Sequence, residues 1–541
     1  MKKLKKLKLI SLVLGVFIAL TAFGCTTPVI PVTEDTLQIA IYKKGYGSDF
    51  ADALAKAYSD KTGVDAKLTY ITSSPDGIDS KIPIASSGID VVFDISGRYN
   101  AALAVNNYFN GYEKAYADLT SVYDAPADPA YAEVQANSSL KNRDIINETL
   151  VDMLANDKDG KNYVMPWVMD LTGIVLNKTI WERDAAKLGN PEIPKTTDEM
   201  FTLFDKIKNT SGTPYAFKYG GQNTYVGEFN SITWLAQYEG KDNMENIYQG
   251  KDGNGIYTPE IFNSPAREKA FEVVRKMLLK TNGYVHTYDS ASHIFMSQIQ
   301  FLEGGAYFCT NGSWLEREVL EDNFDQGEVE IEFIKTPVLS AIVDKWPAVF
   351  TGNGGTTKDE KLRAVLDYID GDTLTKPSFL SGSAGDAILA HLTDARRTES
   401  SLAPIHYAYI PAYSKHIDEA KKFLRFALSK EGQEVMLKAS FGNMFPLNVD
   451  PSQFDYYKSS DISSFAKSTM AIFQNSILAA RSAKYPMVYR GGIDLVRLNA
   501  TPEIAFGGSD PVGVSAFMQA EFNFYNSNWS DRMSWAAVSN P

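Results

Sequence analysis

The residue types that most often carry chemistry are sparse in this sequence. Five histidines are spread along the chain without metal-ligand spacing, namely His286, His293, His391, His406 and His416. The motifs His-Glu-x-x-His, Gly-x-Ser-x-Gly, Gly-x-x-x-x-Gly-Lys-[Ser/Thr] and Gly-x-Gly-x-x-Gly are all absent. Acid pairs are too common, with 66 Asp and Glu residues, to exclude a glycosidase from sequence alone.

One acidic segment is similar to the start of a calcium loop. Asp252-Gly253-Asn254-Gly255 has the right first residues, but no further acids follow at the required intervals. We therefore expect a turn there, and we expect neither a metal ion nor a cofactor in this protein.

The first 25 residues have the pattern of an export signal. Met1 to Lys8 carries five lysines, Leu9 to Leu20 is apolar apart from Ser11 and Gly15, and Cys25 follows directly on small residues. The apolar run is shorter than the ~20 residues that span a bilayer. The segment resembles the lipobox of bacterial lipoproteins, which implies lipid attachment at Cys25 and a location on the outer face of the cell membrane. An ordinary secretory cut is the alternative.

The charge of the chain excludes several classes of partner. Removal of residues 1–24 takes away five lysines and changes the net charge from -13 to -18. A body this acidic, without a Lys/Arg block, is a poor partner for nucleic acid or anionic lipid. Cys309 is the second of the two cysteines, so no intrachain disulfide is possible once Cys25 carries a lipid. The apolar residues around Cys309 favour a buried core thiol.

The elements that position any site begin after a short tether, residues 25–35. Alternating apolar residues at 37–41 predict a strand, residues 66–71 and 89–95 predict two more, and a helix capped by Ser48 lies between the first two. This spacing predicts parallel pairing with right-handed crossovers. Ligands of such sheets bind beyond the carboxyl ends of the strands, which here means Tyr46 and Asp94.

Several segments occur in the order and spacing of a known family. They are residues 159–167 (DGKNYVMPW), 172–178 (TGIVLNK), 194–200 (PKTTDEM), 301–306 (FLEGGA) with 312–314 (GSW), and 420–426 (AKKFLRF). Together they resemble the family 1 extracellular solute-binding proteins, although Leu176 replaces the usual Tyr before Asn177. The resemblance implies the carbohydrate-binding branch, relatives of maltose-binding protein that deliver sugars to an ABC importer.

The resemblance also implies a two-lobed α/β fold of type II, in which each lobe is a mainly parallel sheet flanked by helices and hinge strands join the lobes. We expect an N-terminal lobe from residues 36–167 and 338–453 and a C-terminal lobe from residues 168–337 and 454–541. Pro166 and Pro337 then lie near the hinge. Residues 345–403 fit the family pattern poorly, and we interpret them as a possible insertion in the N-terminal lobe.

A sugar site needs flat aromatic platforms and polar side chains around the rim, because a sugar ring has apolar faces and peripheral hydroxyls. The candidates are Trp167, Trp234, Trp314 and Tyr46 as platforms, with Asp94, Asp170 and Asn311 as rim residues. By resemblance, Trp314 lies at the cleft wall of the C-terminal lobe. Core packing is the alternative for each tryptophan.

The expected function is therefore capture of a carbohydrate in the cleft, closure of the hinge, and docking of the monomeric protein on the transmembrane subunits of an ABC permease. No catalysis on the sugar is expected. Two other functions stay open from the sequence, namely a surface glycan-binding lipoprotein without a transporter and a secreted glycoside hydrolase.

Overall fold

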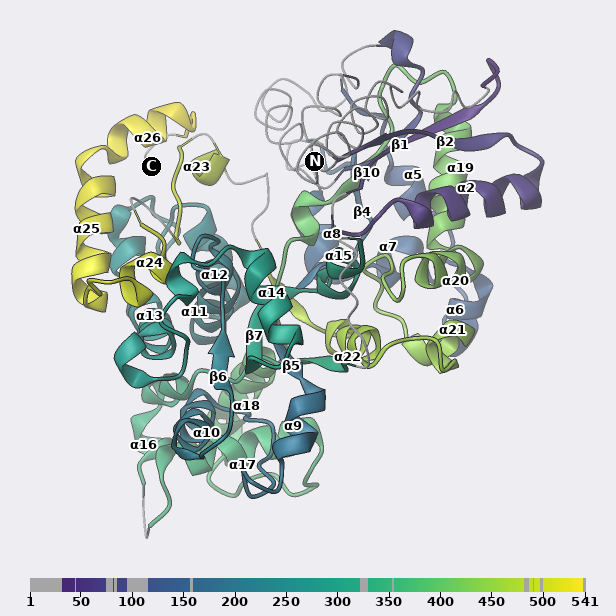
Figure 1. Cartoon of the computed structure of the whole chain (residues 1–541). Helices are drawn as coiled ribbons and strands as arrows, with labels where there is room; N and C mark the ends of the chain where they lie inside the picture. Colours follow the sequence, from purple (N-terminus) through teal and green to yellow (C-terminus); the bar gives the residue numbers. More distant parts are fainter. Residues whose placement is uncertain are drawn as a thin grey trace, which may run out of the picture.

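Two mixed β-sheets, each flanked by helices, form two lobes in the computed structural model (Figure 1). The structure describes residues 32–43, 45–73, 81, 85–94, 115–155, 159–321, 329–352, 355–480, 486–489, 491–496 and 500–538. The predicted two-lobed α/β fold is confirmed, but the prediction of mainly parallel sheets is wrong, because both sheets also contain antiparallel pairs. The expected export signal and Cys25 lie outside the described residues.

The first lobe contains a five-stranded sheet of order β2-β1-β3-β10-β4. Its strands are β1 (Leu37–Tyr42), β2 (Ala66–Thr72), β3 (Val91–Phe93), β4 (Met165–Pro166) and β10 (Tyr407–Tyr409). β1 pairs in parallel with both β2 and β3, as the strand-helix-strand pattern predicts. β10 is antiparallel to its neighbours β3 and β4.

Helix α2 (Asp49–Thr62) connects β1 to β2 and buries Phe50, Leu54 and Tyr58. It ends at Gly63, whose φ of +76° is the left-handed conformation that glycine adopts readily. Ser48 precedes the helix but makes no side-chain capping hydrogen bond, so that predicted cap is wrong. The other helices of this lobe are α5 (Thr120–Tyr123), α6 (Pro129–Val134), α7 (Asn142–Ile145), α8 (Glu148–Leu154), α19 (Ile417–Leu428), α20 (Lys430–Ala439) and α21 (Asp455–Lys458).

The second lobe contains the sheet β11-β9-β5-β7-β6, with β8 also paired to β5. Its strands are β5 (Leu171–Asn177), β6 (Tyr215–Lys218), β7 (Ala306–Gly312), β8 (Ile331–Ile334), β9 (Thr398–Ser401) and β11 (Ile477–Ala479). Every residue of β5 and β7 is buried, so these strands form the centre of the lobe. Cys309 lies in β7 as the expected buried thiol, and burial raises its pKa.

Thirteen helices of the described part of the chain belong to this second lobe. They are α9 (Lys178–Asp184), α10 (Thr197–Asn209), α11 (Ile232–Glu239), α12 (Lys241–Tyr248), α13 (Pro265–Leu278), α14 (Ile294–Leu302), α16 (Pro347–Phe350), α17 (Lys358–Asp370), α18 (Gly382–Arg397), α23 (Pro486–Tyr489), α24 (Pro502–Gly507), α25 (Val514–Ser527) and α26 (Trp529–Trp535). Thr196 caps α10 by accepting the Glu199 N–H at 3.2 Å.

The chain passes between the sheets three times, at the β4–β5 and β9–β10 connections and on the way from β10 to β11, and the first two crossovers run side by side. The Leu402 N–H donates to the Asp170 carbonyl at 3.2 Å, and the Ser401 hydroxyl donates to the Met169 carbonyl at 3.2 Å. Helices α15 (Leu315–Glu321) and α22 (Ser464–Phe473) lie between the lobes in Figure 1. Motion of one lobe against the other must therefore bend the two crossovers together.

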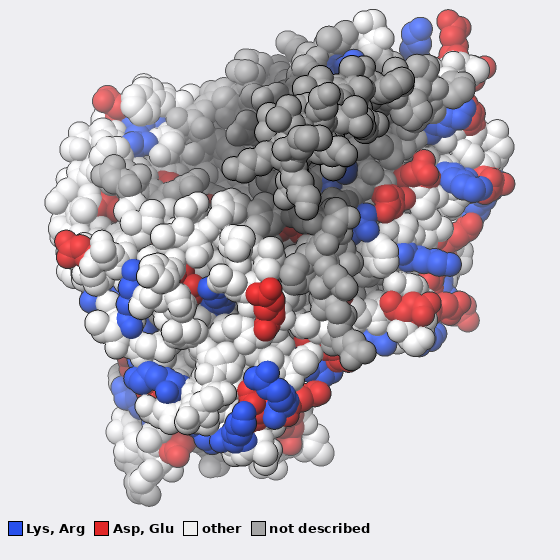
Figure 2. Space-filling view, viewed as in Figure 1, with Lys and Arg blue, Asp and Glu red and all other residues white. Residues whose placement is uncertain are grey.

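The structure differs from the predicted lobe boundaries for residues 338–401. β9 pairs antiparallel with β5, so it belongs to the second sheet and not to the first. Helices α17 and α18 share an apolar cluster with Val338 and pack beside Tyr238 of α11. Lys195 of the second lobe also forms ion pairs with Asp367 and Asp370 on α17. Charges of both signs alternate over the lower end of this lobe (Figure 2).

Two buried carboxyl groups give this lobe a predictable response to pH. Glu399 on β9 accepts hydrogen bonds from the Thr336 N–H at 2.9 Å and hydroxyl at 2.6 Å. Glu503 on α24 accepts from the Gly227 N–H at 2.8 Å. Burial raises the pKa of both carboxyl groups to about 7.

We expect stability to fall as the pH rises from about 4.5 to about 7. In this window the native state keeps the two protons and the unfolded state has lost them, at a cost of roughly 1.4 kcal/mol per pH unit for each acid. Urea unfolding at pH 5 and pH 8 measures the difference. The variants Glu399→Gln and Glu503→Gln, which stay neutral, should each show a smaller decline than the unsubstituted chain. An equal decline in all three proteins would contradict the assignment.

Candidate functional site

Three of the predicted site residues meet where the two lobes join. Tyr46 follows β1, Asp170 directly precedes β5, and Trp314 follows β7. Together with Ser313 and His406 they form what we call the hinge cluster. Asn311 lies nearby on β7, where its side chain accepts the Gly312 N–H at 2.9 Å.

Asp170 is the centre of the hinge cluster. Its carboxylate is fully buried, accepts the Tyr46 hydroxyl hydrogen bond, and lies 2.5 Å from Nδ1 of His406. The Tyr46 hydroxyl is also 3.2 Å from the Ser313 hydroxyl. Burial, followed by the negative charge of Asp170, raises the pKa of Tyr46 well above its ordinary value, so Tyr46 remains a neutral donor.

The backbone at Asp170 is strained, since its φ of +49° is left-handed and it is not a glycine. Such a conformation costs on the order of 1–3 kcal/mol and persists when its surroundings enforce it. Here the enforcing contacts come from Tyr46 of the first lobe and from His406 on the other crossover. The hinge cluster therefore fixes the geometry of both crossovers at once.

The Trp314 ring is enclosed in this structure. It makes edge contacts with Tyr46, Tyr225 and Phe229, with centroid distances of 6.4, 5.9 and 6.0 Å, and is 6% exposed. A Cβ atom at Gly312 would lie 2.1 Å from the ring, so the close approach requires glycine. The cavity beside Tyr46 and Ser313 has a volume of about 20 Å³. That volume suits about one water molecule and excludes a sugar ring.

Trp167 and Trp234 pack in the core, which corrects their prediction as exposed platforms. Each is fully buried, and each indole N–H donates to a backbone carbonyl, that of Asp94 at 2.9 Å and that of Pro337 at 3.0 Å. Trp167 also stacks on Phe50 with a centroid distance of 5.0 Å. The Asp94 side chain is fully buried as well, so these three side chains present no surface to a ligand in this structure.

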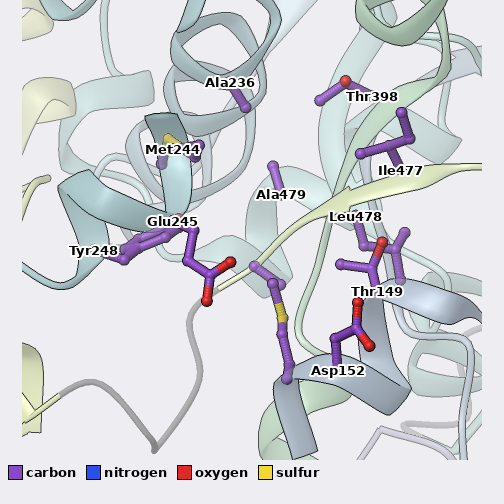
Figure 3. A pocket seen from close by; sticks show the side chains of 12 residues that line it. Thr149, Asp152, Ala236, Met244, Glu245, Tyr248, Thr398, Ile477, Leu478 and Ala479 are labelled. Carbon is purple, nitrogen blue, oxygen red and sulfur yellow. The ribbon is translucent and has the colours of Figure 1, made fainter. Parts of the chain in front are cut away.

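A different pocket opens between the lobes, and we call it the interlobe pocket. It is bounded by α8 of the first lobe, by α11 and α12 of the second, and by β11 and the start of β9 (Figure 3). Its lining residues are Thr149, Asp152, Met153, Ala236, Met244, Glu245, Tyr248, Thr398, Ile477, Leu478, Ala479 and Ala480. Both lobes therefore contribute side chains to one space.

The lining of the interlobe pocket combines apolar and acidic groups. Tyr248 and Met244 line it from α12, and Met153 lines it from α8. The carboxylates of Glu245 on α12 and Asp152 on α8 lie on opposite sides of the same space (Figure 3). An aromatic ring, thioether groups and two carboxylate acceptors suit a ligand that has an apolar face and donating hydroxyl groups.

The interlobe pocket has a volume of about 40 Å³. Pockets that hold small molecules are typically about 300–1,000 Å³. A ligand of that size fits only if α8 and α12 move apart, and the two crossovers are the connections that allow this motion. In the observed arrangement this space is therefore too small for such a ligand.

Sequence reasoning missed this pocket because none of its residues forms a motif. One local signal was present. Met244, Glu245 and Tyr248 lie at i, i+1 and i+4 of a helix, so they project to one side of it. Nothing in the sequence indicates that Asp152, about 90 residues earlier, faces them.

The described part of the chain contains no group of three or more His, Cys, Asp or Glu side chains that could hold a metal ion. Asp252 accepts the N–H groups of Asn254 at 2.9 Å and Ile256 at 3.0 Å, which confirms the predicted turn.

Among the described residues we find no helix that combines the length and the hydropathy needed to cross a membrane.

Comparison with known proteins adds a family and a fold. The sequence model of the family described as "Bacterial extracellular solute-binding protein" matches residues 44–434. The solved structure "SBP RafE in complex with raffinose" is similar with a TM-score of 0.50 and 14% sequence identity, over 90% of this chain and 98% of that chain. At this identity the likeness concerns the fold alone. No curated protein sequence matches the chain.

Proposed function

Because the chain belongs to the bacterial extracellular solute-binding protein family, we propose that it binds a carbohydrate, specifically an oligosaccharide, between its two lobes. The closed protein then delivers the sugar to the transmembrane subunits of an ABC importer. RafE, which shares the fold, is described in complex with raffinose, and this supports a sugar ligand.

The interlobe pocket is the observation that carries this proposal. A sugar ring packs its C–H face on an aromatic ring, and Tyr248 with Met153 and Met244 offers such a surface. Hydroxyls on the rim of the sugar donate charge-assisted hydrogen bonds to carboxylates, and Glu245 and Asp152 supply these from opposite lobes. A ligand that contacts both carboxylates favours the closed arrangement over the open one.

Closure is a rotation about the two adjacent crossovers, residues 166–171 and 401–407, where we place the first two lobe boundaries; the third connection, before β11, bends with them. The hinge cluster lies against both segments, so its contacts change when the lobes separate. In the separated state Tyr46 and Trp314 become accessible and can contact the sugar as it enters. This keeps a binding role for two of the predicted platforms.

We further propose that a lipid on Cys25 holds the protein on the outer face of the membrane, close to the permease. Replacement of Cys25 by Ser should move the protein to the soluble fraction without changing its melting temperature, because Cys25 precedes the folded lobes. Fractionation and mass spectrometry of the N-terminal peptide measure this. Unchanged membrane retention without acyl mass on the peptide would refute the anchor.

A calorimetric screen of neutral oligosaccharides against the mature protein tests the function. We expect at least one ligand to bind and to raise the melting temperature by an amount that follows RT ln(1 + [L]/Kd). Mass spectrometry of the recovered ligand should show it unchanged. A shortened sugar would indicate a glycoside hydrolase instead, and a complete lack of binding would remove the carbohydrate proposal.

A further inference from the structure

Two exposed aromatic rings lie together at the C-terminal edge of the second lobe, away from the interlobe pocket. Phe524 on α25 is 38% exposed and Trp535 on α26 is 59% exposed. In Figure 1 α25 forms the outer left edge of the lobe and α26 lies at its top. Exposure of large apolar rings costs free energy, so two such rings beside each other indicate a contact surface.

One buried arginine holds both rings. The Arg532 guanidinium is 5.1 Å from the centroid of Phe524 and 5.9 Å from that of Trp535. Nη1 of Arg532 donates to the carbonyls of Gly491 and Gly492, at 2.7 and 2.8 Å, so the guanidinium is fixed to the body of the lobe. Rings held in this way lose little conformational entropy when they bind a ligand.

The outward face of α25 beside these rings has no charge. Its exposed residues are Ser515, Ala516, Gln519, Ala520, Asn523, Phe524, Asn526 and Ser527. The one charged residue of the helix, Glu521, is buried against Arg267. The left edge of the molecule, where α25 lies, is largely white in Figure 2. On α26 the exposed Asp531 lies one turn before Trp535, so an anionic partner, such as an anionic lipid surface, finds no complement here.

The polar groups of this face are amides and hydroxyls. The Gln519 side-chain amide donates a hydrogen bond to the side-chain oxygen of Asn523 at 2.9 Å, and Asn523 directly precedes Phe524. We propose that Phe524, Trp535 and the Asn523 amide form a second carbohydrate-contact surface for a neutral glycan. Rings stack on sugar faces and amides bond to hydroxyls, while the surface lacks the wider apolar area of a stable protein interface.

This inference rests on the proposed function, since it assumes that the protein meets glycans. Structurally, the surface and the α12 wall of the interlobe pocket belong to the same lobe. An atom added at Gly250, just after Tyr248 of α12, would lie 3.5 Å from the ring of Trp529 on α26. The surface therefore moves together with the α12 wall when the lobes close.

The test is affinity electrophoresis of the full chain in gels that contain amylopectin, galactomannan, xyloglucan or arabinoxylan. We expect at least one polysaccharide to retard the protein, and Phe524→Ala/Trp535→Ala to weaken that interaction about 10-fold. Tyr288→Ala is the matched control, because Tyr288 is 73% exposed on the same lobe and should have no effect. Melting temperatures should agree between variants.

Two results would overturn this inference: no retardation by any of the four polysaccharides, or equal retardation of the double variant. The calorimetric screen with oligosaccharides reports on the interlobe pocket and does not depend on these two results. The proposed function is therefore tested independently of the second surface. Normal polysaccharide binding by the double variant with reduced sugar import would instead identify the surface as a protein contact.

Discussion

Replacement of Tyr248 by Ala is expected to weaken oligosaccharide binding by about 1–3 kcal/mol, a roughly 5- to 150-fold increase in Kd. The loss is large because Tyr248 supplies the aromatic face of the interlobe pocket and is 2% exposed, so its removal takes away stacking area and admits water. Isothermal titration calorimetry with the best ligand of the screen measures the change.

Two nearly isosteric variants separate binding from folding. Glu245→Gln and Asp152→Asn keep the size of each side chain and remove the charge-assisted acceptor, so each should weaken binding with little change in melting temperature. Trp314→Ala provides the contrasting case at the hinge cluster. Unchanged affinity in the three pocket variants, combined with a large loss in Trp314→Ala, would move the ligand site to the hinge cluster.

The second large effect is expected on stability, from Arg267→Met. Arg267 lies in α13 and is 2% exposed, and its guanidinium pairs with the Glu521 carboxylate of α25. It also donates to the carbonyl of Leu495, at 2.6 Å from Nη2, and to that of Phe262, at 3.0 Å. Loss of one partner of a buried ion pair costs about 3–5 kcal/mol, because the other charge stays buried and unpaired.

Urea denaturation of Arg267→Met measures this loss, with Glu521 as the partner left behind. Burial raises the pKa of the Glu521 carboxyl group, so protonation can relieve part of the cost at acidic pH. The double variant Arg267→Met/Glu521→Met should recover part of the stability, since it removes both charges. A loss below about 1 kcal/mol for Arg267→Met at neutral pH would contradict the importance of the pair.

Local patterns in the sequence predicted much of the fold. The parallel unit of β1, α2 and β2 and the turn at Asp252 depend on patterns that are local in the sequence. For such features the periodicity and capping rules apply directly. The family pattern then supplied the two-lobed arrangement.

The position of β9 could not be predicted, because strand pairing is decided by contacts across the chain. Its partner β5 is more than 200 residues away, and nothing local distinguishes the two sheets. Aromatic side chains were ambiguous for a related reason. The indole groups of Trp167 and Trp234 are satisfied by carbonyls 73 and 103 residues away, so their burial could not be inferred from neighbouring residues.

A distance measurement between the lobes tests the central claim most directly. Cys309 is buried and burial raises its thiol pKa, so it should not react with a spin label. In a Cys25→Ser background, labels can therefore be attached selectively at two exposed positions, Ser121→Cys on α5 and Asp242→Cys on α12. Without ligand we expect pulsed electron paramagnetic resonance to show a population with a long interlobe distance. A saturating oligosaccharide should shift it to a single short distance. Sugar binding that depends on Tyr248 but leaves the distance distribution unchanged would contradict closure of the lobes on the ligand.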